Sequence, residues 1–320
     1  MKYLSPILAA DLGGTKVLAG IVGGDGYLQN RVKLRSEGGG GLESILRNLY
    51  AAIDRVLDLA TDRPAAIALA AAGVIDIAQG TITNSPNLMA TNGVPIKDLL
   101  ARRYSLPVVL INDASSAAVA EHRLGAGIGT KNMVFLTVST GLGGGIIIDG
   151  KLYQGADGSA GEFGHTSIDL NGPADSCGLF GCLEQNASGT AIARNATNLI
   201  GKGRQSILVK ILSDNGIITT EDVAEAARQG DMLAIEVFNE AMRRLGIGIV
   251  NIVNVFNPEL IVVGGGVSET GDMLFEPVRQ FVAGHAFRLP ASRVKIVPAA
   301  LGDEAGAIGA GLYAREELRL

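Results

Sequence analysis

The sequence predicts an α/β protein with two related halves, and three observations carry this prediction. Apolar runs of strand length alternate with stretches of helical periodicity. Residues 7–28 and residues 134–153 share one order of elements, namely strand, glycine turn, strand, glycine turn and strand. The 44 glycines gather around these runs, where tight turns need them. Two unrelated meanders would give the same pattern, so the repeat by itself leaves that alternative open.

In the first half, the opening meander predicts mixed rather than wholly parallel sheets. A Leu and Ile periodicity then marks an amphipathic helix, and a long polar loop passes through Asn87 and Gly93. The predicted strands are 6–12, 16–22, 27–34, 65–70 and 107–111, and the predicted helices are 42–59, 95–104 and 114–124.

In the second half, strands come first and helices follow. Ser188 begins one helix, and Thr219 with Asp222 resembles a capping box at the start of another. The remaining predicted elements are strands 133–139, 145–148, 151–153, 260–263 and 294–297, a long helix over 231–256 that ends before Pro258, and a final helix over 305–314.

Composition restricts the classes of function. With 320 residues, of which 47% are apolar and 18% charged, two folded domains are expected. A net charge of −5 argues against nucleic-acid and membrane-surface partners. No apolar run reaches the roughly 18 residues of a membrane helix, and none suits a signal peptide. Two cysteines are too few for a disulfide framework. These features predict a cytoplasmic protein.

Three glycine turns could hold a nucleotide. Asp11, Gly13, Gly14, Thr15 and Lys16 belong to a turn that precedes a strand, which excludes a Walker loop and a dinucleotide fingerprint. Its amides could still bind phosphate, with Asp11 positioning Mg²⁺, although a plain hairpin turn is the alternative.

The second and third turns extend this pattern. The turn 139–145 repeats the chemistry of hydroxyls followed by exposed amides, and it includes Thr140 and Gly141. The third turn contains Gly265 and Gly266, where the absence of side chains would let a flat adenine approach the backbone. The first and second turns together could hold a polyphosphate chain from the two sides of a cleft.

Asn112 and Asp113 lie where a predicted strand ends and a helix begins. Asp is a common helix N-cap, and this is the simpler interpretation. The functional interpretation is that Asp113 accepts the proton of a sugar hydroxyl as it attacks a γ-phosphate, while Asn112 holds a neighbouring hydroxyl.

The stretch 159–184 is irregular and rich in residues of the metal-ligand type. It contains His165, both cysteines and the carboxylates of Glu162 and Glu184. Its frequent glycines prevent a long helix or strand, and its distributed apolar residues argue against disorder.

These motifs together resemble the ROK family of sugar kinases over essentially the whole chain. The matching stretches are DLGGTK at 11–16, AAGVID at 71–76, SPNL at 85–88, NDASSAA at 112–118, STGLGGGI at 139–146, GEFGH at 161–165, CGLFGCLEQNASG at 177–189 and VVGGGV at 262–267. The pair formed by GEFGH and CGLFGCLE is the most specific of them.

The resemblance implies a duplicated actin-like, ribonuclease-H-like ATPase fold with an active-site cleft between two domains. It implies transfer of the ATP γ-phosphate, with Mg²⁺, to a sugar, and Asp113 as the general base. The implied sugar-binding residues are Gly73, Asn87, Asn112, Glu162, His165 and Glu184, and the implied phosphate and metal residues are Asp11, Thr15, Lys16, Thr140 and Gly141. Domain boundaries are expected at 1–117 plus 304–320 and at 118–303, with the recognition segment over 159–189.

The resemblance also implies a structural zinc ion, which family members bind through the His of GExGH and three cysteines. Here Asp175 occupies the first cysteine position, so the expected ligands are His165, Asp175, Cys177 and Cys182. Zinc accepts carboxylate oxygen, so a four-ligand site is chemically possible. The alternatives are a zinc site completed by water and the loss of zinc binding.

Glucose is the first choice of sugar, because LEQNASG at 183–189 resembles a stretch of bacterial glucokinases. Fructose, mannose, N-acetylmannosamine and N-acetylglucosamine are alternatives, and polyphosphate is an alternative donor. A sugar-sensing repressor is disfavoured because Asp11 leaves little room for a preceding DNA-binding domain. Asp113 argues against a sugar-binding protein without catalysis. A homodimer or homotetramer is the family expectation.

Overall fold

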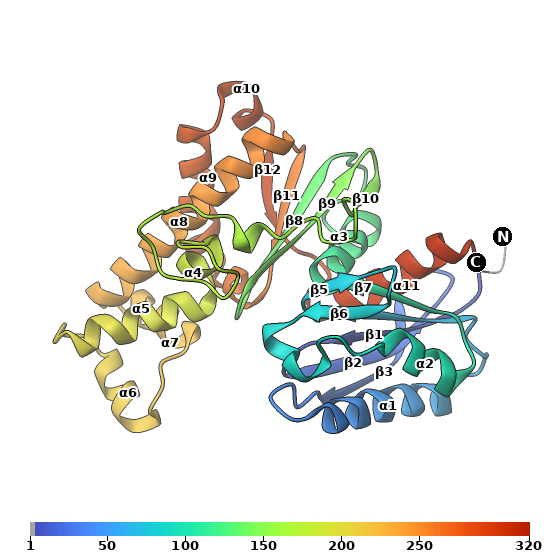
Figure 1. Ribbon diagram of the computed structural model, residues 1–320. Coiled ribbons are helices and arrows are strands. Elements are labelled where there is room, and N and C mark those ends of the chain that lie inside the picture. Colours follow the sequence, from blue (N-terminus) through green and yellow to red (C-terminus); the bar gives the residue numbers. More distant parts are fainter. Residues whose placement is uncertain (1–3) are drawn as a thin grey trace. The chain divides into compact units, whose positions relative to one another are not determined.

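The computed structural model describes residues 4–320, which divide into two units (Figure 1). The first unit comprises residues up to Lys131, Gly145–Gly161 and Ala300–Leu320, and the second comprises Asn132–Gly144 and Glu162–Ala299. The boundary expected at 117/118 falls inside a helix that belongs whole to the first unit. The first unit also includes a hairpin that the expected boundaries gave to the second.

The first unit contains a mixed five-stranded sheet of order β3-β2-β1-β4-β7. Its strands are β1 (Ile7–Leu12), β2 (Lys16–Val22), β3 (Leu28–Arg35), β4 (Ala66–Ala71) and β7 (Val108–Asn112). β1 is antiparallel to β2 but parallel to β4, which is in turn parallel to β7. The expectation of a mixed sheet is therefore confirmed.

Helices cover both faces of this sheet (Figure 1). They are α1 (Leu42–Leu59), α2 (Ile96–Tyr104), α3 (Asp113–Leu124) and α11 (Ala305–Leu318). Side chains alternate along a strand, and Leu8 and Leu12 of β1 pack in one core with Ile45 of α1. Asp11 points to the other face, where it lies against Gly306 of α11.

The prediction of a long loop after residue 70 is wrong, because this stretch contains short regular elements. These are β5 (Val74–Asp76), β6 (Thr81–Asn84) and the 3₁₀ helix η1 (Pro86–Thr91). Strands of three and four residues are too short to show a hydrophobic period. The chain enters β5 through Gly73, whose φ of +112° lies in the region that favours glycine.

The second sheet has the order β10-β9-β8-β11-β12. Its strands are β8 (Met133–Val138), β9 (Leu142–Ile148), β10 (Lys151–Tyr153), β11 (Leu260–Gly264) and β12 (Lys295–Pro298). β11 is parallel to both β8 and β12. β9 begins three residues earlier than expected, and the division between the units falls within it.

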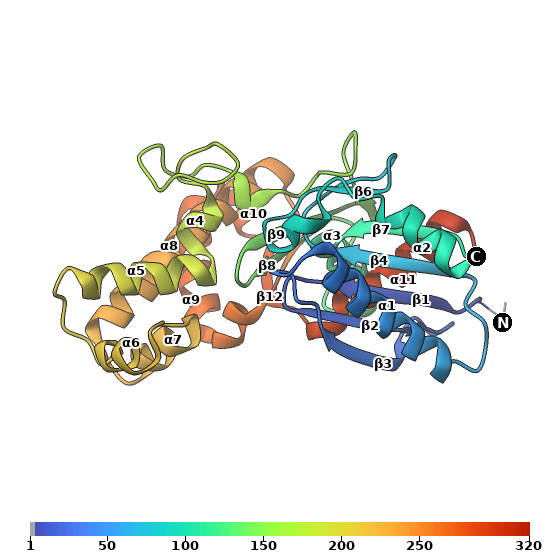
Figure 2. The same cartoon turned by 60° about the horizontal axis from the view of Figure 1, so that its bottom comes forward.

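Helices dominate the rest of the second unit. They are η2 (Phe163–His165), α4 (Leu183–Ala187), α5 (Gly189–Gly201), α6 (Leu208–Asn215), α7 (Thr220–Arg228), α8 (Met232–Phe256), η3 (Gly266–Thr270), α9 (Asp272–His285) and α10 (Arg288–Ala291). The predicted capping box of Thr219 and Asp222 is present at the start of α7. In Figures 1 and 2, α5, α6 and α7 lie side by side around one end of α8.

The remaining element of the first unit is η4 (Gly302–Glu304), directly before α11. None of the helices formed by residues 4–320 combines the length and the apolarity needed to cross a bilayer.

Candidate active site

Polar side chains gather at one edge of the first sheet. In the parallel registers, Asp11 of β1 is opposite Ala70 of β4, and Ala71 is opposite Asn112 of β7. The carboxyl ends of these strands therefore meet at one edge, where α/β proteins bind their ligands. Asp11, Asn112 and Asp113 lie there, as their predicted positions at strand ends require, and Gly73 follows β4 and accepts a hydrogen bond from Asn112.

Asn112, and not Asp113, caps helix α3. The Asn112 Oδ1 atom accepts a hydrogen bond from the Ser115 amide at 2.9 Å. Its Nδ2 atom donates to the Gly73 carbonyl and to Asp113 Oδ1, each at 3.1 Å. The simpler interpretation of Asp113 as a cap is thus wrong, because its neighbour performs that task.

The Asp113 carboxylate is fixed through one of its oxygens. Oδ1 accepts from the Ala114 amide at 2.9 Å as well as from Asn112. Burial raises the pKa of Asp113, although the backbone amides of Ala114 and Asp113 and the Asn112 side chain oppose the rise. Orientation by its neighbours and a raised pKa are the properties that a general base requires.

Asp11 lies in the same electrostatic environment. Burial and the negative charge of Asp113 raise the pKa of Asp11 to about 7, while Lys16 opposes and Asp303 adds to the rise. The negative charge of a neighbouring carboxylate raises the pKa of an acid in this way. A cation bound here would restore the charged form of Asp11, so the pair suits Mg²⁺, which takes one or two carboxylates together with phosphate oxygens.

The first glycine turn is tight and crowded. The Gly13 amide donates to the Lys16 carbonyl at 2.9 Å. A Cβ atom at Gly14 would come within 2.9 Å of the Asn87 Cβ atom, so the turn and the η1 segment are in close contact. Thr15 is exposed at the tip. Lys16 pairs with Asp303 at 2.6 Å, a partner that sequence analysis did not single out.

The second glycine turn, over 139–141, is joined to Glu184 within the second unit. The Leu142 amide donates to Glu184 Oε2 at 2.8 Å. A Cβ atom at Gly141 would lie 2.5 Å from the same oxygen. The Ser139 carbonyl accepts from the Gly189 amide at 2.7 Å. A predicted phosphate-binding turn and a predicted sugar-binding carboxylate are thus in direct contact.

The GEFGH motif packs against the same group. Gly164 contacts the Leu142 carbonyl so closely that a side chain there would collide with it. Glu162 immediately precedes η2, and His165 ends it. The three residues predicted to hold sugar hydroxyls in the second unit, Glu162, His165 and Glu184, therefore come from two short elements in mutual contact.

The four predicted metal ligands lie close together. One ligand atom each from His165, Asp175, Cys177 and Cys182 lies within 4.8 Å of the others. The two thiols are free, with their Sγ atoms 3.5 Å apart, and His165 Nδ1 lies 2.9 Å from Asp175 Oδ2. Nitrogen, oxygen and two sulfurs around one centre form a set that tetrahedral zinc accepts.

The fold of the segment brings these ligands together. The Ile168 amide donates to the Gly181 carbonyl, and the Leu183 amide donates to the Thr166 carbonyl, both at 2.9 Å. Burial works against ionisation of Asp175, but hydrogen bonds from Cys182 and His165 outweigh it and lower the pKa of this carboxyl. Asp175 is thus kept in the charged form that ligates metal.

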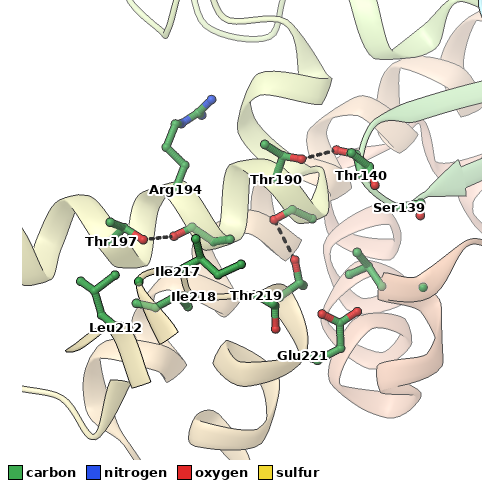
Figure 3. Close-up of a pocket in the computed structure, with 16 residues that line it drawn as sticks. Ser139, Thr140, Thr190, Arg194, Thr197, Leu212, Ile217, Ile218, Thr219 and Glu221 are labelled. Atoms are coloured by element: carbon green, nitrogen blue, oxygen red, sulfur yellow. Dashed lines mark hydrogen bonds between the residues drawn. The ribbon is translucent and has the colours of Figure 1, made fainter. Parts of the chain in front are cut away.

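A cavity of about 510 Å³ opens in the second unit beside the second glycine turn (Figure 3). Ser139 and Thr140 follow strand β8, and Gly266 and Val267 follow β11, so one end of the cavity lies at the carboxyl ends of two parallel strands. Its other walls come from α5 to α7 and include Arg194, Thr197, Leu212, Ile217, Ile218, Thr219 and Glu221.

The third glycine turn shapes this end of the cavity. Gly265 has a φ of +85°, and a Cβ atom on it would lie 2.5 Å from the Val138 carbonyl oxygen. Only glycine fits this close approach of β11 to β8. Gly266 then lines the cavity at the same end as Ser139 and Thr140.

The walls from α5 to α7 were missed by sequence analysis. Thr219 was identified as a helix cap, which places Glu221 in the first turn of α7, but no motif connects this helix to residue 140. Their proximity depends on tertiary packing around α8, for which a single sequence carries no local signal.

Two five-stranded sheets, each opening on a hairpin with a glycine turn, define the class of this protein as the duplicated actin-like ATPase fold. The chain belongs to the ROK family, whose family model matches residues 7–317. The fold class and the family predicted from sequence are both confirmed.

Individual relatives span the whole chain. It is 35% identical to a glucokinase of Halalkalibacterium halodurans, over 97% of this chain and 95% of that protein. It is 34% identical to an N-acetylmannosamine kinase of Shigella flexneri, over 97% and 99%. Among solved structures, a ROK family glucokinase from Streptomyces griseus in complex with glucose and AMPPNP superposes with a TM-score of 0.82 at 35% identity, covering 97% of this chain and 99% of that one.

Proposed function

We propose that this protein transfers the γ-phosphoryl group of ATP to a hexose, with glucose as the preferred acceptor and the 6-hydroxyl as the attacking group. The observation that carries the proposal is the environment of Asp113. This carboxylate lies at the ligand-binding edge of the sheet, is oriented by Asn112 and has a raised pKa. It is not needed as the helix cap.

Asp113 is the general base of this reaction. It accepts the proton of the sugar hydroxyl as that oxygen attacks the γ-phosphorus atom, and the bond from phosphorus to the bridging oxygen of ADP breaks. Phosphoryl transfer needs little covalent chemistry from the protein, so positioning and charge stabilisation supply most of the acceleration.

The sugar is held by hydrogen bonds to its hydroxyls. We assign this role to Asn112, with Gly73 and Asn87 beside it, and in the second unit to Glu162, His165 and Glu184. Carboxylates accept from hydroxyl donors, and such charge-assisted bonds are about twice as strong as neutral ones. The Asp175 contact uses His165 Nδ1, so Nε2 is the ring nitrogen assigned to the sugar.

We assign glucose as the preferred sugar because one stretch of the sequence resembles bacterial glucokinases. Relatives named as glucokinase and as N-acetylmannosamine kinase are almost equally identical to this chain, at 35% and 34%. Overall identity therefore does not separate them. The stretch 183–189, which contains Glu184, supports glucose because of its similarity to bacterial glucokinases.

The nucleoside of ATP occupies the cavity beside Thr140 and Gly266. A volume of about 510 Å³ with apolar walls suits a purine nucleoside, whereas polyphosphate has no group to fill it. Thr140 and Gly141 bind phosphate oxygens in the second unit, and Gly13, Gly14, Thr15 and Lys16 do so in the first. Asp11 would hold the hydrated Mg²⁺ that neutralises charge on the phosphates when it is bound.

Zinc has a structural role in this proposal. His165, Asp175, Cys177 and Cys182 would hold the ion and fix the segment that presents Glu162 and Glu184. Because all four positions are protein ligands, no open position for substrate or water is expected.

A panel of acceptor sugars tests the function. ADP release from ATP and Mg²⁺ is measured with glucose, fructose, mannose, N-acetylmannosamine and N-acetylglucosamine. We expect the highest kcat/KM with glucose and the appearance of glucose 6-phosphate. A higher kcat/KM with another sugar would overturn the glucose assignment. Sugar binding without ADP release for any sugar would favour a sugar-sensing role over catalysis.

A further inference from the structure

The cavity beside the second glycine turn has one acidic side chain. Of the residues that line it in the described part of the chain, Glu221 is the single acid and Arg194 the single base. Glu221 is the second residue of α7, and it is exposed to the cavity and to solvent. A carboxylate at this position needs a reason, because the proposed nucleotide is itself an anion.

Four of the other polar side chains of the cavity already have partners within the protein. Thr190 Oγ1 donates to the Thr140 carbonyl at 2.8 Å, and Thr197 Oγ1 donates to the Ala193 carbonyl at 2.9 Å. Thr220 Oγ1 donates to the Gly189 carbonyl at 2.8 Å. Arg194 Nη1 donates to Gln185 Oε1 at 2.6 Å. These groups stabilise the wall and have little capacity left for a ligand.

Glu221 differs from them. No residue among 4–320 forms an ion pair or a hydrogen bond with its carboxylate. The capping box of α7 is made by Thr219 and Asp222, so the helix does not depend on Glu221 for its start. Its two oxygens are therefore free acceptors facing a cavity that offers few others.

The position of Glu221 along the cavity is informative. In the view of Figure 3, Glu221 lies below Ser139 and Thr140, and Ile217 and Leu212 lie farther along the cavity beyond Thr219. A nucleotide with phosphates at the glycine turn and its base against the apolar wall has its ribose at the intermediate position. The 2′ and 3′ hydroxyls of ribose are hydrogen-bond donors, which a carboxylate accepts well.

We propose that Glu221 accepts hydrogen bonds from the ribose hydroxyls and so selects a ribonucleotide as the phosphoryl donor. This inference rests on the proposed function, since it concerns the nucleotide of that reaction. A nucleotide without the 2′ and 3′ hydroxyls offers no hydrogen bond to the Glu221 carboxylate, so it binds more weakly.

The test compares ATP with 2′,3′-dideoxyATP in the wild-type protein and in Glu221→Ala. In the wild type we expect KM to be about tenfold higher for the dideoxy donor, as for loss of one charge-assisted hydrogen bond. In Glu221→Ala we expect the KM for ATP to rise about tenfold, with kcat changed much less, and the KM for the dideoxy donor to change little. The two donors then become nearly equivalent.

Glu225→Ala is the matched control. Glu225 lies one turn further along α7, is exposed, and does not line the cavity. Its removal should leave the preference for ATP intact. If Glu221→Ala keeps the wild-type preference, or if the control loses it equally, the inference is overturned.

Calorimetry separates this inference from the function on which it rests. Binding of ADP and of 2′,3′-dideoxyADP needs no turnover, and the same tenfold difference is expected between them. A wild-type protein that phosphorylates no sugar but binds ADP with this Glu221-dependent preference would reject the proposed function and support the ribose contact. Equal affinities for the two diphosphates in the wild type would reject the contact itself.

Discussion

At the scale of single residues, the two strand-end acids of the first unit have different neighbours. Asp113 is oriented by Asn112 and the Ala114 amide. Asp11 lies against Gly306 and close to the charge of Asp113. A buried carboxylate close to another carboxylate destabilises the folded state, and such positions are typical of functional sites.

Asp11→Asn should stabilise the protein at alkaline pH while abolishing activity. The pKa of Asp11 is raised from 3.8 to about 7, which corresponds to a loss of about 4 kcal/mol in folding stability when Asp11 is ionised. We expect roughly half of this, because part of the Asp11 surface is accessible.

The pH dependence follows from the sign of this shift. Because the folded protein binds the proton more tightly than the unfolded chain does, the wild type loses stability as pH rises from about 4 through 7. The variant lacks this loss. Urea unfolding at pH 8 should therefore favour the variant, and at pH 4.5 the two should be close. An equal difference at both pH values would contradict the assignment.

At the scale of elements, the start of α11 is shaped to admit Asp11. Gly306 lies in the first turn of α11, and a Cβ atom there would collide with the Asp11 carboxylate. Glycine is a poor helix former, so helix propensity does not explain its presence. The close approach to Asp11 does.

Gly306→Ala should lower kcat/KM by about tenfold to a hundredfold, because displacement of a catalytic group by a fraction of an ångström has effects of this size. Gly284→Ala is the control, since Gly284 is also helical but its Cβ atom would meet nothing within 4 Å. The control should keep full activity. Equal activity of both variants would contradict the role given to the Asp11 position.

The segment that carries His165, Asp175, Cys177 and Cys182 is a second part of the fold whose role can be measured. Protein prepared without chelator should contain about one zinc per chain, and Asp175→Ala should lose most of it and unfold at a lower temperature. Asp157→Ala is the control, because Asp157 is exposed and is not one of the four clustered ligands. A zinc content near zero in the wild type would exclude Asp175 as a ligand.

At the scale of the whole molecule, local patterns predicted most of the elements. Helix 42–59 and strand 16–22 match α1 and β2 residue for residue. The helix is long enough to show its apolar periodicity over several turns, and glycine turns mark both ends of the strand. α9 was missed, and it contains Pro277 within the helix, which weakens a helical pattern. α6 was also missed, because eight residues give few turns of periodicity.

The candidate site could be predicted only in part. Residues at strand ends, such as Asp11 and Asp113, follow from the order of strands and turns. The clustering of His165 with Asp175 was expected from the resemblance to the family, and the structure brings these two side chains within 2.9 Å. The Lys16 pair with Asp303 and the position of Glu221 arise from contacts between distant segments. No local rule in a single sequence encodes them.

Whether Asp113 is the general base of a glucose kinase is tested by comparing glucose-dependent ADP release by the wild type and by Asp113→Asn, together with the dissociation constant for glucose. We expect turnover in the wild type, a loss of about 10²-fold to 10⁴-fold in kcat in the variant, and glucose affinity within a few fold in both. Undiminished turnover in Asp113→Asn, or no glucose-dependent ADP release from the wild type, would contradict the claim.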